Sequence, residues 1–160
     1  MIKKIRKRVL ENYKKFTFLI LLLGLFVACE PKQEPINYGV DECELCRMRI
    51  MEDKYGAELV TEKGKVYKFD SIECLIKYSL NKNLIGVNDQ LVLVSDFSNP
   101  GELADARKSY YVQNNKFRSP MGLNVSAFAS ESELLKFITE NSGEKLNWIE
   151  VIELVKRDDF

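Results

Sequence analysis

Hydrophobic and polar positions divide the 160-residue chain into three parts. Residues 16–28 form an apolar run of thirteen residues without a charged side chain, and this run directly follows a basic segment. Residues 29–40 are polar and contain two prolines, which is typical of an extended linker. From residue 41 onward, short apolar runs alternate with polar turns, so this part has the pattern of a folded domain.

The first half of this domain predicts the order strand, strand, helix, strand. The corresponding ranges are 56–62, 65–69, about 71–80, and 90–94. A Gly-containing turn at Lys63-Gly64 joins the two strands as a β-hairpin. Asp70-Ser-Ile-Glu73 has the form of a capping box, and we expect Asp70 to be the N-cap of the helix.

The second half predicts the same order, at 109–113, 123–128, about 131–141, and 146–149, followed by a short C-terminal helix. Ser130-Glu-Ser-Glu133 is a second capping box. The helix after it should bury one face, made of Leu134, Leu135 and Ile138. We therefore expect an α+β fold of two small β-β-α-β units in tandem, over 41–98 and 102–160, joined near Asn99-Pro-Gly101.

Composition excludes several classes of function. Lys and Arg number 24, Asp and Glu number 24, and the chain contains no histidine. A net charge of zero argues against a general nucleic-acid binder, which needs a basic surplus. The absence of histidine excludes Ser-His-Asp and Cys-His catalysis and any imidazole metal site. Metal chemistry in this chain has to use sulfur or oxygen ligands.

The N-terminal segment predicts export and lipidation. Residues 1–28 contain seven basic residues and one acidic residue, a net charge of +6, whereas the rest of the chain carries −6. A helix of thirteen apolar residues rises about 20 Å, too short for the ~30 Å hydrocarbon core of a bilayer, so this segment fits a secretory signal peptide. Val27-Ala28-Cys29 resembles the lipobox of bacterial lipoproteins, with Phe26 where Leu is usual.

We therefore expect acylation of Cys29, a lipidated tether over 29–40, and a location in the cell envelope facing the periplasm. Glu30 in place of an aspartate retention signal favours the outer membrane. An uncleaved anchor and an ordinary signal peptide are the alternatives.

Three cysteines then remain in the exported protein, Cys43, Cys46 and Cys74. Cys43-Glu-Leu-Cys46-Arg-Met48 places two thiols and a thioether within six residues. Cys74 should lie in the first turn of the predicted helix, where the helix N-terminus lowers the pKa of a thiol. Met121 lies in the loop Arg118-Ser-Pro-Met-Gly122.

Several interpretations of these sulfur residues are open. Cys43 and Cys46 could be a redox dithiol, although no strand-to-helix transition is predicted there, or a structural disulfide in an oxidising envelope. Three thiolates without a fourth protein ligand make a poor structural zinc site. Thiolate and thioether ligands together select copper(I), and the thioether needs no deprotonation. For Met51, we expect ordinary core packing.

Three segments in order resemble the NosL family of lipoprotein copper chaperones associated with nitrous-oxide reductase. These are the Cys43–Met51 segment, Phe69-Asp-Ser-Ile-Glu-Cys74, and Ser119-Pro-Met-Gly122 followed by 125–128. The resemblance runs over essentially the whole mature chain. It implies a non-enzymatic protein that binds one copper(I) and hands it to the assembly machinery of the reductase, including an ABC-type transporter complex.

The resemblance also implies a set of ligands. Cys46 and Met48 correspond to the Cys-Gly-Met of the family, with Arg47 in place of the glycine. Asp70 and Cys74 match its Phe-Asp…Cys segment, and Met121 matches its Ser-Pro-Met-Gly loop. We expect copper(I) to be held by residues among Cys46, Met48, Cys74 and Met121, with Cys43 as a further ligand or a neighbouring thiol. The runner-up function is an envelope thiol-disulfide oxidoreductase that uses Cys43 and Cys46.

Overall fold

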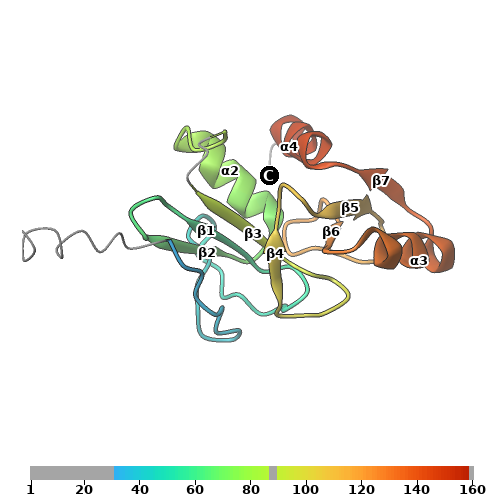
Figure 1. Ribbon diagram of the computed structural model, residues 1–160, viewed down its shortest axis with the longest axis horizontal. Coiled ribbons are helices and arrows are strands. Elements are labelled where there is room, and N and C mark those ends of the chain that lie inside the picture. The colour runs from blue at the N-terminus through green and yellow to red at the C-terminus, as the bar shows by residue number, and fades with distance from the viewer. Residues whose placement is uncertain (1–30, 87–89, 159–160) are drawn as a thin grey trace, which may run out of the picture. The chain divides into compact units, whose positions relative to one another are not determined.

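The computed structural model describes residues 31–86 and 90–158 (Figure 1). The predicted signal peptide and the lipidation site Cys29 lie outside the described residues. The described residues form one compact unit. The described elements are β1 (Ala57–Val60), β2 (Val66–Phe69), α2 (Ile72–Asn81), β3 (Leu91–Ser95), β4 (Leu103–Asp105), β5 (Tyr110–Gln113), β6 (Val125–Phe128), α3 (Glu131–Asn141), β7 (Glu144–Leu146) and α4 (Trp148–Arg157).

The first sheet has the antiparallel strand order β2-β1-β3-β4. The predicted hairpin is present, with Ala57 opposite Phe69 and Val60 opposite Val66. Helix α2 follows β2 and packs against β1 and β2, as Figure 1 shows. Because α2 and the segment before β1 cover the sheet, all four residues of β1 are buried. The predicted α+β class is confirmed.

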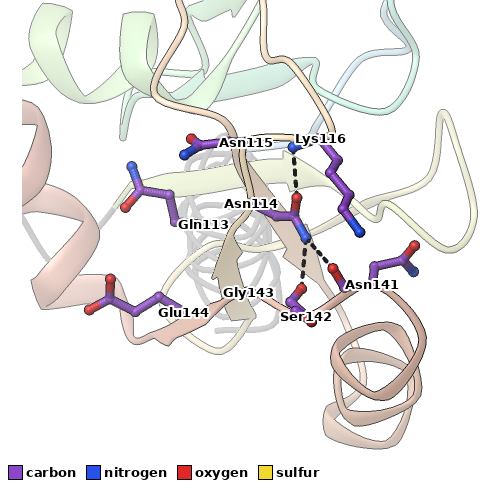
Figure 2. Close-up of a pocket in the computed structure, with 8 residues that line it drawn as sticks. All are labelled: Gln113, Asn114, Asn115, Lys116, Asn141, Ser142, Gly143 and Glu144. Atoms are coloured by element: carbon purple, nitrogen blue, oxygen red, sulfur yellow. Dashed lines mark hydrogen bonds between the residues drawn. The ribbon is translucent and has the colours of Figure 1, made fainter.

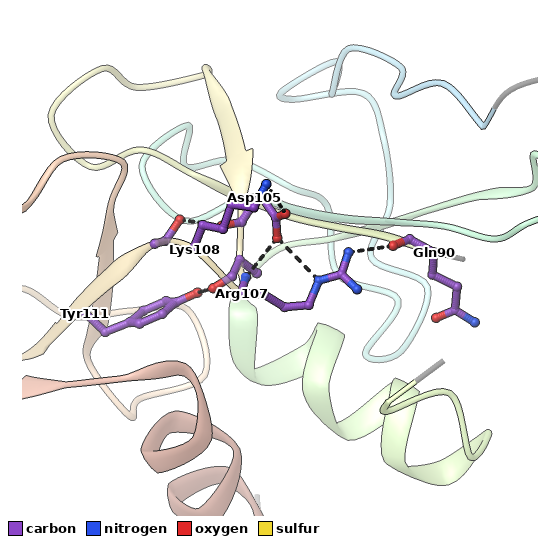
Figure 3. Close-up of polar contacts among 7 residues, drawn as sticks. Gln90, Asp105, Arg107, Lys108 and Tyr111 are labelled. Carbon is purple, nitrogen blue, oxygen red and sulfur yellow. Dashed lines mark hydrogen bonds and ion pairs between the residues drawn. The ribbon is translucent and has the colours of Figure 1, made fainter. Parts of the chain in front are cut away.

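Strand β4 is absent from the sequence prediction. It follows Asn99-Pro-Gly101 yet pairs with β3, so the first sheet extends beyond the predicted junction between the halves. All three of its residues are partly buried, so the strand has no alternation of buried and exposed positions from which it could be predicted. Arg107 connects the segment after β4 to the residue before β3. Its guanidinium donates to the Gln90 carbonyl at 2.7 Å and lies 3.4 Å from the Asp105 carboxylate (Figure 3).

The second sheet has the order β6-β5-β7, and α3 packs against β5 and β6. Strand β7 ends at Leu146, so the prediction of a strand to residue 149 is wrong there. Asn147 instead caps α4, since its side chain accepts from the amides of Ile149 and Glu150. In α3, Leu134 and Phe137 face the core, whereas Leu135 is 51% exposed, contrary to expectation.

The two halves share a hydrophobic core. Phe69 and Leu75 of the first half belong to the same buried cluster as Val151 and Ile152 of α4. A second cluster contains both aliphatic and aromatic side chains. Phe97, which follows β3, packs there against rings of the second half, Phe117, Phe128 and Phe137. The halves are therefore joined by side-chain packing as well as by the chain.

The predicted linker contacts the first sheet through Glu34, Ile36 and Tyr38. The Glu34 amide donates to the buried Glu58 carboxylate at 3.1 Å, and Ile36 is buried. The Tyr38 hydroxyl lies 3.2 Å from Ser95 Oγ. A Cβ at Gly56 would stand 2.7 Å from the same Tyr38 oxygen, so a larger residue at this position would displace the Tyr38 side chain. Among the described residues, no helix is long and apolar enough to span a membrane.

A polar cleft of about 450 Å³ lies between the ends of β5 and α3 (Figure 2). Asn114 connects the two sides of this cleft, since its side-chain amide donates to the carbonyls of Asn141 and Ser142 at 3.0 and 2.7 Å. The Asn114 side-chain oxygen accepts from the Lys116 amide. The lining contains no cysteine or methionine, so this cleft is separate from the sulfur residues.

Replacement of Tyr111 tests the junction between the sheets. Tyr111 is fully buried and its hydroxyl donates to the Ala106 carbonyl (Figure 3). Tyr111→Phe leaves this buried carbonyl without a partner, and we expect a loss of about 1–3 kcal/mol in the free energy of unfolding, measured by urea denaturation. The half-buried Tyr110 provides the matched control, because Tyr110→Phe should change stability by less than about 0.5 kcal/mol. Equal effects of the two variants would contradict this role of the hydroxyl.

Candidate metal centre

The cysteine pair lies in a short hairpin-like segment before β1. The backbone of residues 39–50 folds back on itself, with a bridge between Glu42 and Arg49 and a hydrogen bond from the Cys43 amide to the Met48 carbonyl at 2.8 Å. The Glu44 amide donates to the Lys68 carbonyl of β2 at 2.9 Å. The segment is thus fixed to the edge of the first sheet, and Cys43 is directed into the core.

The start of α2 brings the third cysteine to the same place. Ser71, not Asp70, is the N-cap, and its hydroxyl accepts from the Cys74 amide at 3.4 Å. The predicted capping residue is therefore wrong by one position. Since Asp70 remains outside the helix, its carboxylate is available elsewhere and accepts a hydrogen bond from Cys46 Sγ at 3.3 Å.

Four side chains meet in one cluster, which we call the thiol cluster: Cys43, Cys46, Asp70 and Cys74. One ligand atom from each lies within 4.8 Å of the others. Cys43, Asp70 and Cys74 are buried and Cys46 is half-buried, and all three thiols are free. The structure therefore brings together the three cysteines that the sequence singled out and adds a carboxylate.

The thiols of the cluster differ strongly in acidity. The hydrogen bond between Cys74 and Cys43 lowers the pKa of Cys43 to about 6, and burial raises the pKa of Cys46 to about 12. The pKa of Cys74 is raised, first by its hydrogen bond to Cys43 and then by burial. The expected lowering by the helix N-terminus is wrong for Cys74, because the neighbouring sulfur and burial outweigh the helix dipole. The favoured thiolate is Cys43.

Asp70 makes the cluster suitable for a cation. Its Oδ1 atom is buried and has no hydrogen-bond partner among the described residues. A buried carboxylate oxygen without a partner is costly, and a bound cation relieves that cost. The sequence prediction used Asp70 as a helix cap and as part of the matched Phe-Asp…Cys segment, and did not place it among the ligands. The signal was present, since an acidic residue stands four positions before Cys74.

The methionines are placed differently from one another. Met48 is 47% exposed, and its carbonyl accepts from the Cys43 amide. Met121 is half-buried and packs against the core cluster that contains Cys43 and Cys74. Met51 is 65% exposed, so the expected core packing is wrong, because Ile50 takes the buried position in this extended segment.

Arg47, which separates Cys46 from Met48, has the left-handed backbone conformation, with φ of +64°. This conformation costs a non-glycine residue about 1–2 kcal/mol. Its side chain is largely exposed, and its ion pair with Glu44 at 3.4 Å adds little stability. The turn between the two sulfur residues therefore has a geometry that suits glycine.

Substitution of Arg47 tests this strain. We expect Arg47→Gly to raise the free energy of unfolding by about 0.5–1 kcal/mol in urea denaturation, the strain relieved being partly offset by the greater freedom of glycine in the unfolded chain. Arg47→Ala removes the same exposed side chain and keeps the strain, so its stability should equal that of the parent within about 0.5 kcal/mol. A less stable Arg47→Gly protein would contradict the assignment.

Comparisons with known proteins find a family and a solved structure that match this chain. The sequence model of the NosL family matches residues 38–155, a range that includes the whole thiol cluster and Met121. A search of curated proteins finds no match. Among solved structures, the copper chaperone NosL from Shewanella denitrificans matches with a TM-score of 0.61 and 23% identity, over 75% of this chain and 95% of that chain. The fold is thus that of the Shewanella protein, and because the family match covers most of its length, this chain belongs to the NosL family.

Proposed function

We propose that this protein is a metallochaperone that binds one copper(I) ion at the thiol cluster. The observation that carries the proposal is the approach of Cys43, Cys46 and Cys74 sulfur atoms, with an Asp70 oxygen, to within 4.8 Å of one another. Thiolate ligands are soft and favour copper(I) over harder ions. The similarity to the Shewanella protein, a copper chaperone, supports the same conclusion.

Met121 and Met48 are the proposed thioether ligands. A thioether is neutral, so it completes the coordination of copper(I) without adding a further negative charge to a buried site. The chain has no histidine, and no imidazole can compete with sulfur for this position. A mixed set of thiolates and a thioether suits a protein that releases its metal to a partner.

Zinc(II) is the competing metal. The three cysteines alone lack a fourth protein ligand for zinc(II), and Asp70 offers one. Three thiolates and a carboxylate match the tetrahedral preference of zinc(II). The thioethers favour copper(I), since zinc(II) sites in proteins use thiolate, imidazole and carboxylate ligands. A test of function therefore has to compare both metals.

The alternative of a thiol-disulfide oxidoreductase receives less support. A catalytic thiol needs access to its substrate, whereas Cys43, the most acidic thiol, is fully buried. The Cys43–Cys46 pair lies in a hairpin-like turn and not at the N-terminus of a helix. Catalysed disulfide exchange by the metal-free protein would revive this alternative.

Delivery to nitrous-oxide reductase is the finer part of the proposal. We infer that a non-enzymatic protein, held by acylated Cys29 on the periplasmic side of the outer membrane, passes copper(I) to the reductase through its ABC-type assembly complex. Support comes from the lipobox-like sequence at 27–29 and from membership of the NosL family. A reductase gene and a transporter gene beside the gene for this chain would strengthen this assignment.

Competition titration tests copper binding. The full chain in detergent is titrated anaerobically with copper(I) in the presence of bicinchoninate, and we expect one ion per chain. Loss of an outer partner of a metal ligand already costs about 10–100-fold in affinity. Loss of a ligand itself should cost more, so Cys46→Ser and Cys74→Ser should each weaken binding by at least about 100-fold.

Met51→Leu is the matched control for Met121→Leu, because Met51 is an exposed methionine that we place outside the site. We expect Met51→Leu to bind copper(I) with the affinity of the parent. Tighter binding of zinc(II) under competition with copper(I), or unchanged copper(I) affinity in the double variant Cys46→Ser/Met121→Leu, would contradict the proposal.

Lipidation is tested separately in cells. The parent should incorporate labelled palmitate and sediment with membranes, and Cys29→Ser should lose both properties, because the thiol is the site of acylation. Cys46→Ser is the control and should keep the label. Retention of label and membrane association by Cys29→Ser would show an anchor of another kind.

A further inference from the structure

Glu73 is a buried carboxylate without a role in the proposed ligand set. It lies in the first turn of α2, directly before Cys74, and has no exposed surface. Its Oε1 atom accepts a hydrogen bond from the Ser119 hydroxyl, 46 residues away in the sequence. An acidic side chain buried in this way is unfavourable unless its contacts compensate the loss of water. The partner of Glu73 therefore indicates what the residue does.

Ser119 Oγ is the centre of the loop that carries Met121. Besides donating to Glu73, it accepts from the amides of Gly122 at 3.2 Å and Asn124 at 2.9 Å. The Ser119 amide in turn donates to the Asn124 side chain at 3.2 Å. One hydroxyl thus closes the turn around Met121 and connects it to α2.

This connection ties two parts of the proposed copper site together. Met121 stands two positions after Ser119, and Cys74 stands one position after Glu73. Met121 also packs against the core cluster to which Cys74 belongs. A loop held at its base presents its thioether at a higher local concentration than a loose loop would.

We infer that the Glu73–Ser119 hydrogen bond positions the Met121 loop against the helix that carries Cys74, so that the Met121 thioether can complete the copper(I) site. Glu73 and Ser119 are positioning residues and do not touch the metal. The inference rests on the proposed copper(I) function. Of the two proposed thioether ligands, Met121 depends on this contact and Met48 does not.

A double-mutant cycle tests the inference through copper(I) affinity, measured by competition with bicinchoninate. Ser119→Ala should weaken binding about tenfold, and Met121→Leu by the same amount or more. The double variant should bind as Met121→Leu does, because a positioning contact has no value once the thioether is absent. Independent, multiplying losses would overturn the inference, and so would an unchanged affinity of Ser119→Ala.

Ser79→Ala is the matched control. Ser79 is a buried serine of α2 whose hydroxyl has no hydrogen-bond partner among the described residues, so the same truncation breaks no loop contact. We expect parental affinity for this variant. If Ser119→Ala does not fold, as judged by circular dichroism, Glu73→Leu breaks the same contact from the helix side and carries the same expectation.

Protection from oxidation is a readout that a merely structural role would not change. Coordinated Met121 should resist sulfoxide formation by peroxide in the copper-loaded parent and lose this resistance in Ser119→Ala at saturating copper(I), as read by peptide mass spectrometry. Exposed Met51 serves as the internal standard. Equal protection in both proteins would overturn the inference. Failure of the parent to bind copper(I) would instead remove the proposed function itself.

Discussion

The capping of helix α2 by Ser71 is the constraint on which the metal centre depends. If Asp70 were the cap, as its sequence pattern suggests, its carboxylate would be used on a helix amide. With Ser71 in that role, Asp70 turns to Cys46 at 3.3 Å and Cys74 enters the core beside Cys43. Because the cap lies one residue later than the sequence pattern predicts, the Asp70 carboxylate is left free to join the three thiols. The four ligand atoms then lie within 4.8 Å of one another.

Packing between the halves holds this arrangement. The core that contains Cys43 and Cys74 also contains Val151 and Ile152 of the last helix, so the thiols are supported by residues from both ends of the folded unit. The Phe97 ring adds a second connection among the aromatic side chains of the second half. Because the buried thiols are packed on all sides, we expect them to be held rigidly. Met48, by contrast, is half-exposed and in contact with solvent.

Local signals in the sequence predict much of the fold. The hairpin around Gly64 and the range of helix α3 follow from turn signals and hydrophobic spacing, because these depend on neighbouring residues. The predicted capping box at Ser130 is wrong in one respect, because Ser130 is the N-cap of α3 but its side chain makes no capping hydrogen bond and lies 2.7 Å from Ser132 Oγ instead. Strand β4, the docking of 34–40 and the role of Asp70 depend on distant partners such as Val94, Glu58 and Cys46, which no local pattern contains. The same reason explains why the acidity of Cys74 differs from the expectation, since another sulfur outweighs the helix N-terminus.

The central claim is that sulfur atoms of this chain hold copper(I). X-ray absorption spectroscopy of the protein loaded anaerobically with one equivalent of copper(I) tests it most directly, because the near-edge region reports the oxidation state and the extended region identifies the bound atoms. We expect a copper(I) edge and a coordination sphere made mainly of sulfur, with room for one oxygen from Asp70 and with no imidazole nitrogen, since the chain contains no histidine. A coordination sphere dominated by nitrogen or oxygen neighbours would contradict the claim.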